Sequence, residues 1–152
     1  MWTGGVRVII IDENRILLVK QYHENREFWL VPGGGIERGE TSVAAAQREV
    51  REETGLEIKV GRLIWHIEEV SEKKGMRFVN FFLADIIGGE LSLGKDPEFG
   101  DDGQVLREVR FFSKDELRAL PEVYPESLKD EIWDILEKGK FDHPVYRIRQ
   151  SK

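Results

Sequence analysis

The sequence contains no cysteine among its 152 residues. Disulfide bonds, thiolate metal sites and a cysteine nucleophile are therefore excluded. Basic charge is also scarce, because 23 Lys and Arg residues face 29 Asp and Glu residues and leave a net charge of −6. A protein that binds nucleic acid through phosphate contacts usually carries a basic patch, and none stands out here. We therefore expect no nucleic acid partner.

Long apolar runs are missing as well. The N-terminal stretch MWTGGVRVIIIDENR has only a short apolar run before Asp12, which suits neither a signal peptide nor a membrane span. No later run is long enough to cross a bilayer, so we expect no membrane partner and a cytoplasmic location. No internal repeat, low-complexity segment or linker interrupts the chain. Its length suits one compact domain, which we expect to span residues 1–152.

Apolar and alternating stretches predict several strands around one long helix. Thr41 or Ser42 is a suitable N-cap for that helix, and Gly55 is a suitable C-terminal stop. A capping-box pattern at Ser113 and Glu116 predicts a short second helix. The predicted strands are 6–11, 16–21, 28–32, 56–70, 76–87 and 108–112, and residues 88–104 form a predicted loop.

The C-terminal part of the chain adds one more helix. Its apolar face comprises Leu128, Ile132, Ile135 and Leu136, and it is expected to end near Gly139. The basic tail 141–152 is interpreted in two ways, as a cover for a sheet edge or as part of an interface. Strands and helices mix without a regular βαβ alternation, which predicts an α+β fold with a mixed sheet flanked by helices.

The stretch REVREETG places three acids, Glu49, Glu52 and Glu53, just before the helix stop at Gly55. A helix C-terminus already carries partial negative charge and disfavours carboxylates. Acids spaced i,i+3 and i,i+4 also repel each other, at about 0.2–0.5 kcal/mol per pair. A charge run on a helix is usually a solvated face, but acids that cost stability at a helix end suggest that a cation binds among them.

The same acids share one face of the predicted helix. With Arg48 they span roughly 140° of its surface, and we expect this edge to be exposed. Val43, Ala46 and Val50 lie on a different face that suits packing against the sheet. Clustered carboxylates without Cys or a nearby His favour a hard ion, Mg²⁺ or Mn²⁺, over zinc.

A run of three glycines, Gly33 to Gly35, precedes this helix. Glycines let the backbone approach a ligand closely, so strand, glycine turn and acidic helix are expected to form one pocket. Written out, residues 34–56 read GGIERGETSVAAAQREVREETGL. This stretch resembles the Nudix box, Gly-x5-Glu-x7-Arg-Glu-U-x-Glu-Glu-x-Gly-U, in which U is a bulky aliphatic residue. The fixed positions that match are Gly34, Glu40, Arg48, Glu49, Val50, Glu52, Glu53, Gly55 and Leu56.

The resemblance covers 23 residues without a departure, and the flanking FWLVPGG also looks like this family. It implies a Nudix-type α/β/α sandwich and a hydrolase that cleaves the diphosphate of a nucleoside diphosphate linked to another group. The partner is then a small molecule and the cofactor Mg²⁺, with Mn²⁺ as a substitute. A homodimer is left open.

The resemblance also assigns roles within the box. Glu49, Glu52 and Glu53 are implied as metal ligands, helped by the backbone carbonyl of Gly33. Arg48 is implied to orient the glutamates, and Glu40 to fix the loop against the helix. Gly34 and Gly55 complete the box as structural positions.

The general base is left open between Glu49 and a later acid. Family members often supply an acid from a downstream loop, and the candidates in GKDPEFGDDGQ are Glu98, Asp101 and Asp102. Asp102 lies closest to the usual position, before the predicted strand 108–112. A solvated loop without a catalytic role is the alternative.

Substrate contacts are less constrained. Arg26 is a candidate for a substrate phosphate, with a solvated side chain as the alternative. Trp29 is a candidate for stacking on a nucleobase, whereas core packing is the alternative for both Trp29 and Trp65. Several subgroup signatures of the family are absent: no proline lies between Pro32 and Pro97, no tyrosine lies near residues 72–74, and no coenzyme A motif precedes Pro32.

These absences favour a modified nucleoside triphosphate over ADP-ribose or another nucleotide sugar. A non-catalytic domain that senses a nucleotide metabolite is the alternative from another class. Such domains usually lose box glutamates, and this chain keeps them all.

Overall fold

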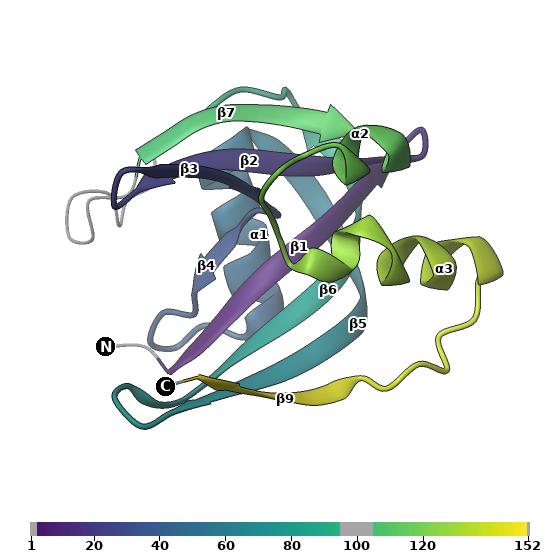
Figure 1. Cartoon of the computed structure of the whole chain (residues 1–152). Coiled ribbons are helices and arrows are strands. Elements are labelled where there is room, and N and C mark those ends of the chain that lie inside the picture. The colour runs from purple at the N-terminus through teal and green to yellow at the C-terminus, as the bar shows by residue number, and fades with distance from the viewer. Residues whose placement is uncertain (1–2, 95–104, 152) are drawn as a thin grey trace.

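The structure is a computed structural model, and it describes residues 3–94 and 105–151 (Figure 1). The strands are β1 Gly4–Asp12, β2 Arg15–His23, β3 Arg26–Leu30, β4 Gly33–Gly35, β5 Leu56–Ser71, β6 Gly75–Gly89, β7 Val105–Phe112, β8 Val123–Tyr124 and β9 Tyr146–Ser151. The helices are α1 Ser42–Thr54, α2 Lys114–Arg118, the 3₁₀ turn η1 Glu126–Lys129 and α3 Glu131–Lys138. None of the described helices has the length and apolar character needed to span a bilayer.

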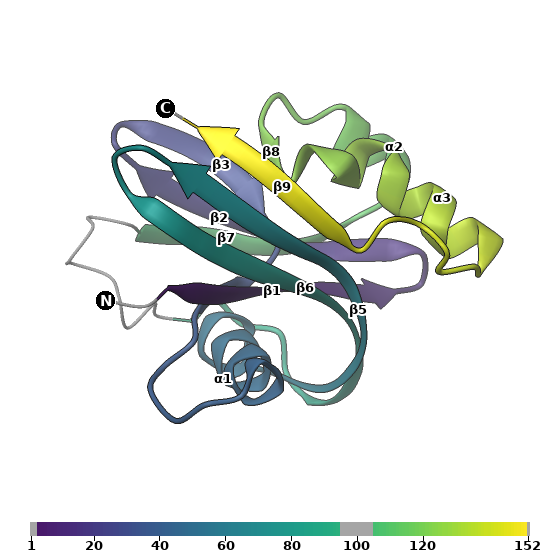
Figure 2. The ribbon, with the colours of Figure 1, turned by 90° about the horizontal axis from the view of Figure 1, so that it is seen from below.

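The strands form a mixed sheet in the order β8-β3-β2-β1-β6-β5-β9, with β4 added to β1 and β7 added to β2. β1 runs parallel to β6 over most of its length and forms a hairpin with β2 only at its end. The sheet therefore curls about β1. Figure 2 shows α1 on one side of the β1–β6–β5 strands, and α2 and α3 on the other. The predicted α+β fold with a mixed sheet flanked by helices is confirmed.

β1 is buried on both of its faces, which explains its nearly continuous apolar sequence. Val8 and Ile10 pack under α1 together with Ala46 and Val50. Ile9 points into a second core, on the α3 side of the sheet. The expectation that Val43 packs on the sheet is wrong, because its exposed fraction is 42% and burial on α1 begins only at Ala45.

Several element boundaries differ from the sequence expectation. Gly33–Gly35 forms a strand antiparallel to β1, not only a turn. A Cβ atom on Gly33 would lie 2.0 Å from the carbonyl oxygen of Val6, so only glycine allows this approach. The short elements β8 and η1 were not predicted, and Leu128 belongs to η1, outside α3.

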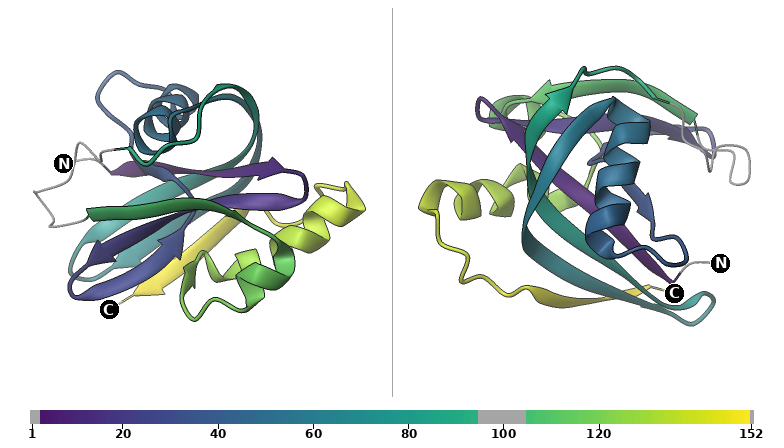
Figure 3. Two further views of the ribbon diagram at one scale, coloured as in Figure 1. Left: turned by 90° about the horizontal axis from the view of Figure 1, so that it is seen from above. Right: turned by 180° about the vertical axis from the view of Figure 1, so that it is seen from behind.

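The C-terminal tail forms the edge strand β9, parallel to β5 (Figure 3). Arg147 anchors it to α3: its Nη1 donates to Glu131 Oε1 at 2.7 Å and its Nη2 donates to Glu131 Oε2 at 2.5 Å. The guanidinium also lies over the ring of Trp65, 5.3 Å from the ring centroid. Hydrogen bonding from Arg147 lowers the pKa of Glu131 below its usual value of 4.5.

A Glu131→Gln variant tests this anchor. Since the pKa of Glu131 is lower in the folded state, its ionised form stabilises folding above the ordinary glutamate pKa, and this contribution is lost as the pH falls through the lowered pKa. We expect the variant to lose about 1 kcal/mol of unfolding free energy at pH 7 and to match the wild type in strong acid. Urea unfolding across this pH range measures the difference.

Glu137→Gln is the matched control on the same helix. Its carboxylate is more exposed and pairs with Lys114 at 3.4 Å, so its loss should stay below about 0.5 kcal/mol. A Glu131→Gln deficit that is the same at neutral and acidic pH would contradict the ionic anchor.

Candidate active site

Helix α1 has the ends that its sequence predicts. Thr41 is the N-cap, and its hydroxyl accepts a hydrogen bond from the Ala44 amide at 3.0 Å. Gly55 adopts a left-handed conformation with φ of 77°, which favours glycine. The chain after β6 then returns to this end: Ser92 donates its amide to the Thr54 carbonyl at 2.8 Å, and Gly94 donates to the Glu53 carbonyl at 2.9 Å.

These two amides supply partial positive charge where the helix end carries partial negative charge. The approach is so close that a Cβ on Gly94 would lie 1.6 Å from the Glu52 carbonyl oxygen. This contact was not predicted from the sequence, because Ser92 and Gly94 fall within the predicted loop 88–104. The local electrostatic cost of acids at the end of α1 is thus partly offset by backbone amides.

The acids of α1 are not all on an exposed edge, and that expectation is wrong for two of them. Glu49 is 1% exposed and Glu53 is 2% exposed, whereas the Glu52 side chain is 32% exposed. The reason is strand β4, which lies against this face of the helix. A Cβ on Gly34 would lie 2.5 Å from Glu49 Oε1, and the Gly33 amide donates to Glu53 Oε1 at 3.5 Å. The glycines thus make the space that two carboxylates fill.

Arg48 joins the loop before α1 to the acids on it. Its Nε donates to Glu40 Oε2 at 2.7 Å, and its Nη1 donates to Glu49 Oε1 at 3.0 Å and to Glu52 Oε2 at 3.2 Å. Its Nη2 donates to the Gly35 carbonyl at 2.9 Å. The contact between Arg48 and Glu52 was predicted from their spacing, but those with Glu40 and Gly35 depend on the fold.

The ion pair between Arg48 and Glu40 shifts the pKa values of both residues. Hydrogen bonding to Glu40 raises the pKa of Arg48, and hydrogen bonding from Arg48 lowers the pKa of Glu40. Glu40 also accepts the Glu37 amide at 2.8 Å, so it ties the loop to the helix. Arg48 therefore stays positively charged, and its orientation is fixed from both sides.

The residues around Arg48 suit a divalent cation in their chemistry. The Arg48 guanidinium pairs with four carboxylates, two in the preceding loop (Glu37 and Glu40) and two on α1 (Glu49 and Glu52), and Glu53 is a third acid on α1. The potential ligands are all oxygens, which hard ions prefer. Within the described ranges, however, no three acidic or histidine side chains are gathered tightly enough to hold an ion. The structure shows the carboxylates drawn toward Arg48 and Gly33, and a metal would compete with these contacts.

The other predicted site residues lie elsewhere. Arg26 is mostly exposed on β3 and pairs with Glu122 at 2.9 Å. Trp29 is 6% exposed and packs against Phe112 with ring centroids 4.7 Å apart, which is the core-packing alternative. Trp65 is buried in the same core. The candidate acids Glu98, Asp101 and Asp102 lie outside the described residues.

One charged residue near the site was not singled out from the sequence. Arg7 lies on β1, opposite Gly33 of β4, and its Nη1 donates to the Val31 carbonyl at 3.1 Å. The signal that could have found it is a single arginine within the apolar run VRVIII. A charged side chain in a buried strand is rare unless it has a partner, so such an arginine is a candidate functional residue.

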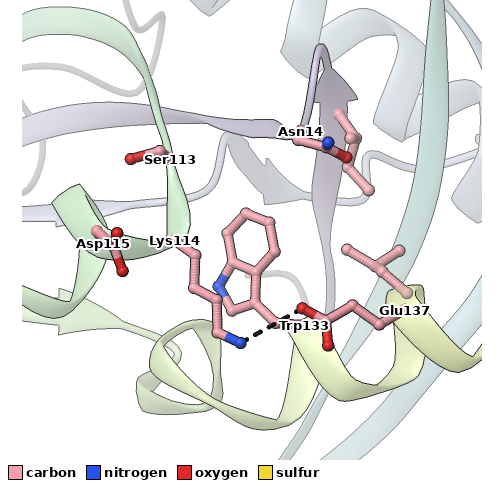
Figure 4. Close-up of a pocket in the computed structure, with 8 residues that line it drawn as sticks. Asn14, Ser113, Lys114, Asp115, Trp133 and Glu137 are labelled. Atoms are coloured by element: carbon pink, nitrogen blue, oxygen red, sulfur yellow. Dashed lines mark hydrogen bonds and ion pairs between the residues drawn. The ribbon is translucent and has the colours of Figure 1, made fainter.

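A cavity of about 570 Å³ lies on the other side of the sheet, between the β1–β2 turn, α2 and α3 (Figure 4). Trp133 and Leu136 contribute its apolar wall, and the ion pair between Lys114 and Glu137 lies beside the indole ring. None of the Nudix-box residues lines it. It is therefore separate from the acids of α1.

A Gly34→Ala variant tests the contact between β4 and α1. The added methyl group would overlap the Glu49 carboxylate and displace it, so we expect kcat to fall at least tenfold, while overpacking costs about 1–3 kcal/mol of stability. Gly88→Ala is the control, because nothing lies closer than 3.7 Å to its new methyl group. Steady-state kinetics and thermal unfolding of both variants give the comparison. Equal turnover in the two variants would argue against the close packing of Gly34 on Glu49.

Comparison with known proteins agrees with the fold and the box. A family model, NUDIX domain, matches residues 1–130. The chain is 35% identical over 126 residues to the ADP-ribose pyrophosphatase of Methanocaldococcus jannaschii, over 80% of this chain and 68% of that protein. It is 37% identical over 93 residues to the 8-oxo-dGDP phosphatase NUDT18 of Homo sapiens, over 60% of this chain but only 27% of that protein.

Among solved structures, a NUDIX hydrolase from Nitrosomonas europaea superposes with a TM-score of 0.73 at 22% identity, covering 92% of this chain and 91% of that one. This likeness concerns the fold. Nudix hydrolases act on phosphorus-containing anhydrides and generally use divalent metal ions. With its complete box, its fold and its match over residues 1–130, the chain belongs to the Nudix hydrolase family.

Proposed function

We propose that this protein is a Mg²⁺-dependent pyrophosphohydrolase that cleaves the diphosphate linkage of a nucleoside diphosphate joined to a second group. The observation that carries the proposal is the pair of buried carboxylates, Glu49 and Glu53, packed against the glycine strand β4. Buried acids cost stability unless a partner compensates for them. A divalent cation would compensate for the charge of these buried acids and would also bind the diphosphate of a substrate.

Each box residue has a role in this proposal. Glu49, Glu52 and Glu53 hold the cation together with the Gly33 carbonyl. When bound, the cation neutralises the diphosphate oxygens and makes a nearby water more acidic. Arg48 aims Glu49 and Glu52 through hydrogen bonds to both, and Glu40 anchors Arg48.

Hydrolysis also requires a group that accepts the proton of the attacking water. Glu49 is our first candidate, because its carboxylate is held between Gly34 and Arg48 on the buried side of α1. Asp102, with Glu98 and Asp101, is the alternative from the segment of the sequence that follows β6. Carboxylates grouped around metal ions share their protons, so the pH profile of the enzyme reports the group as a whole.

The comparisons bear on the substrate. The relative that aligns with 80% of the chain is named an ADP-ribose pyrophosphatase, which supports ADP-ribose or another nucleotide sugar as the substrate class. The absent subgroup signatures favour a modified nucleoside triphosphate, and the match to an 8-oxo-dGDP phosphatase supports modified nucleotides as a second candidate. We place ADP-ribose first because its support covers more of the chain. Intact box glutamates argue against a non-catalytic sensor.

A substrate panel distinguishes these candidates. ADP-ribose, UDP-glucose, 8-oxo-dGDP, 8-oxo-dGTP and the unmodified nucleoside triphosphates are each incubated with the protein and Mg²⁺, and AMP, phosphate and pyrophosphate release are followed. We expect the highest kcat/KM for ADP-ribose, with AMP and ribose 5-phosphate as products. A preference for the 8-oxo compounds would select the second candidate, and no hydrolysis of any compound would reject the proposed function.

Substitution of the acids tests their role in holding a metal. Glu52→Gln and Glu53→Gln should each lower kcat by orders of magnitude, because one ligand charge is lost, while the metal-free protein keeps its stability or gains some through reduced repulsion. Glu57→Gln is the control, since Glu57 is 43% exposed and pairs with Arg51. EDTA should abolish wild-type activity, and Mg²⁺ should restore it. Turnover that survives thorough chelation would reject metal dependence.

A further inference from the structure

Arg7 occupies an unusual position for a charged side chain. It lies half-buried between Val6 and Val8, both of which are completely buried. A guanidinium carries five N–H donors. Of these, one is used in a described contact, the hydrogen bond from Nη1 to the Val31 carbonyl at 3.1 Å. No carboxylate of the described residues forms an ion pair with Arg7.

Arg7 shares with Ile9 the face of β1 that is turned away from α1, but its stem lies against β4, the strand that contacts the acids of α1. Arg7 faces Gly33 in the register of β1 and β4. A Cβ on Gly33 would lie 2.8 Å from Cδ of Arg7, so the arginine stem runs directly against this glycine. The amide of the same glycine donates to Glu53 at 3.5 Å. Gly33 therefore contacts Glu53 through its amide and the side-chain stem of Arg7 through its α-carbon.

The site needs such a cation for an anionic substrate. Arg48 contacts these acids directly, and its guanidinium is already engaged with Glu40, Glu49, Glu52 and the Gly35 carbonyl. Releasing it for a substrate would break the contacts that orient the glutamates. Within residues 3–94 and 105–151, Arg7 uses one donor, in its hydrogen bond to Val31, whereas all the N–H groups of the Arg48 guanidinium are engaged.

We propose that Arg7 is a substrate-binding residue that donates hydrogen bonds to a phosphate of the diphosphate group. The planar guanidinium fits phosphate oxygens in pairs, and such charged hydrogen bonds are stronger than neutral ones. The proposal rests on the proposed function, since it assumes a diphosphate substrate at the acids of α1. It adds to the Nudix box a positive charge from β1.

A purely structural role is the competing explanation. Arg7 holds the Val31 carbonyl next to Pro32, whose own carbonyl accepts the Val8 amide at 2.9 Å. On that account Arg7 only fixes the bend that leads into Gly33. Its removal would then lower stability and kcat together and leave ligand affinity unchanged.

Two variants and one control separate the two roles. Arg7→Met removes the charge and keeps a long apolar stem, while Arg7→Lys keeps the charge. Arg15→Met is the matched control, because Arg15 is 43% exposed on β2 and pairs with Glu13. Binding of α,β-methylene-ADP, whose bridging methylene resists hydrolysis, is measured by calorimetry with Mg²⁺. KM and kcat are measured for the best compound of the substrate panel, and thermal unfolding is measured for every variant.

We expect Arg7→Met to weaken binding of α,β-methylene-ADP by about 10- to 100-fold and to raise KM by a similar factor, with a smaller change in kcat. Arg7→Lys should recover part of the affinity, and Arg15→Met should bind like the wild type. Wild-type affinity in Arg7→Met would overturn the proposal even if the wild type is an active hydrolase. If the wild type binds the analogue in an Arg7-dependent manner but hydrolyses nothing, the proposed function fails and the binding role stands. No binding of the analogue to the wild type would overturn the role of Arg7.

Discussion

The packing of a glycine strand against two acidic side chains is the contact on which the site depends. β4 has no side chains, so it can lie between β1 and α1, where any Cβ on Gly33 or Gly34 would meet the Val6 carbonyl or the Glu49 carboxylate. Glu49 and Glu53 fill the space that remains and become almost completely buried. Their burial raises the cost of negative charge and makes them sensitive to whatever cation is near. Arg48 supplies part of that compensation in the structure.

Contacts at the C-terminal end of α1 reduce the electrostatic cost of its acids. Acids at the C-terminal end of α1 would be disfavoured in an isolated helix. In the folded chain the amides of Ser92 and Gly94 reach the last carbonyls and bring partial positive charge to the same end. The stabilising partners therefore come from residues about forty positions away in the sequence. A local electrostatic rule is valid here, but tertiary contacts offset it.

Much of the fold was predictable because its signals are local. The caps of α1 at Thr41 and Gly55 and the capping box at Ser113 and Glu116 follow from short-range hydrogen bonding, and the structure confirms them. The acids of α1 could be found from their spacing, but their burial could not, since it depends on β4 lying beside the helix. The donors on Ser92 and the position of Arg7 likewise arise only when distant strands pair. Pairing of β9 with β5 was one of two interpretations of the tail, and sequence periodicity alone could not select it.

The parallel pairing of β9 with β5 affects how the chain acquires its structure during synthesis. The register joins His66 to Tyr146, so 80 residues must leave the ribosome after this part of β5 before its partner is available. The outer edge of β5 therefore remains open in the growing chain while β6 already covers its other side. Open strand edges invite pairing with other molecules, and charged residues discourage it. The consecutive glutamates Glu68 and Glu69 lie on that edge, where they can keep a nascent chain from pairing with its neighbours until β9 arrives.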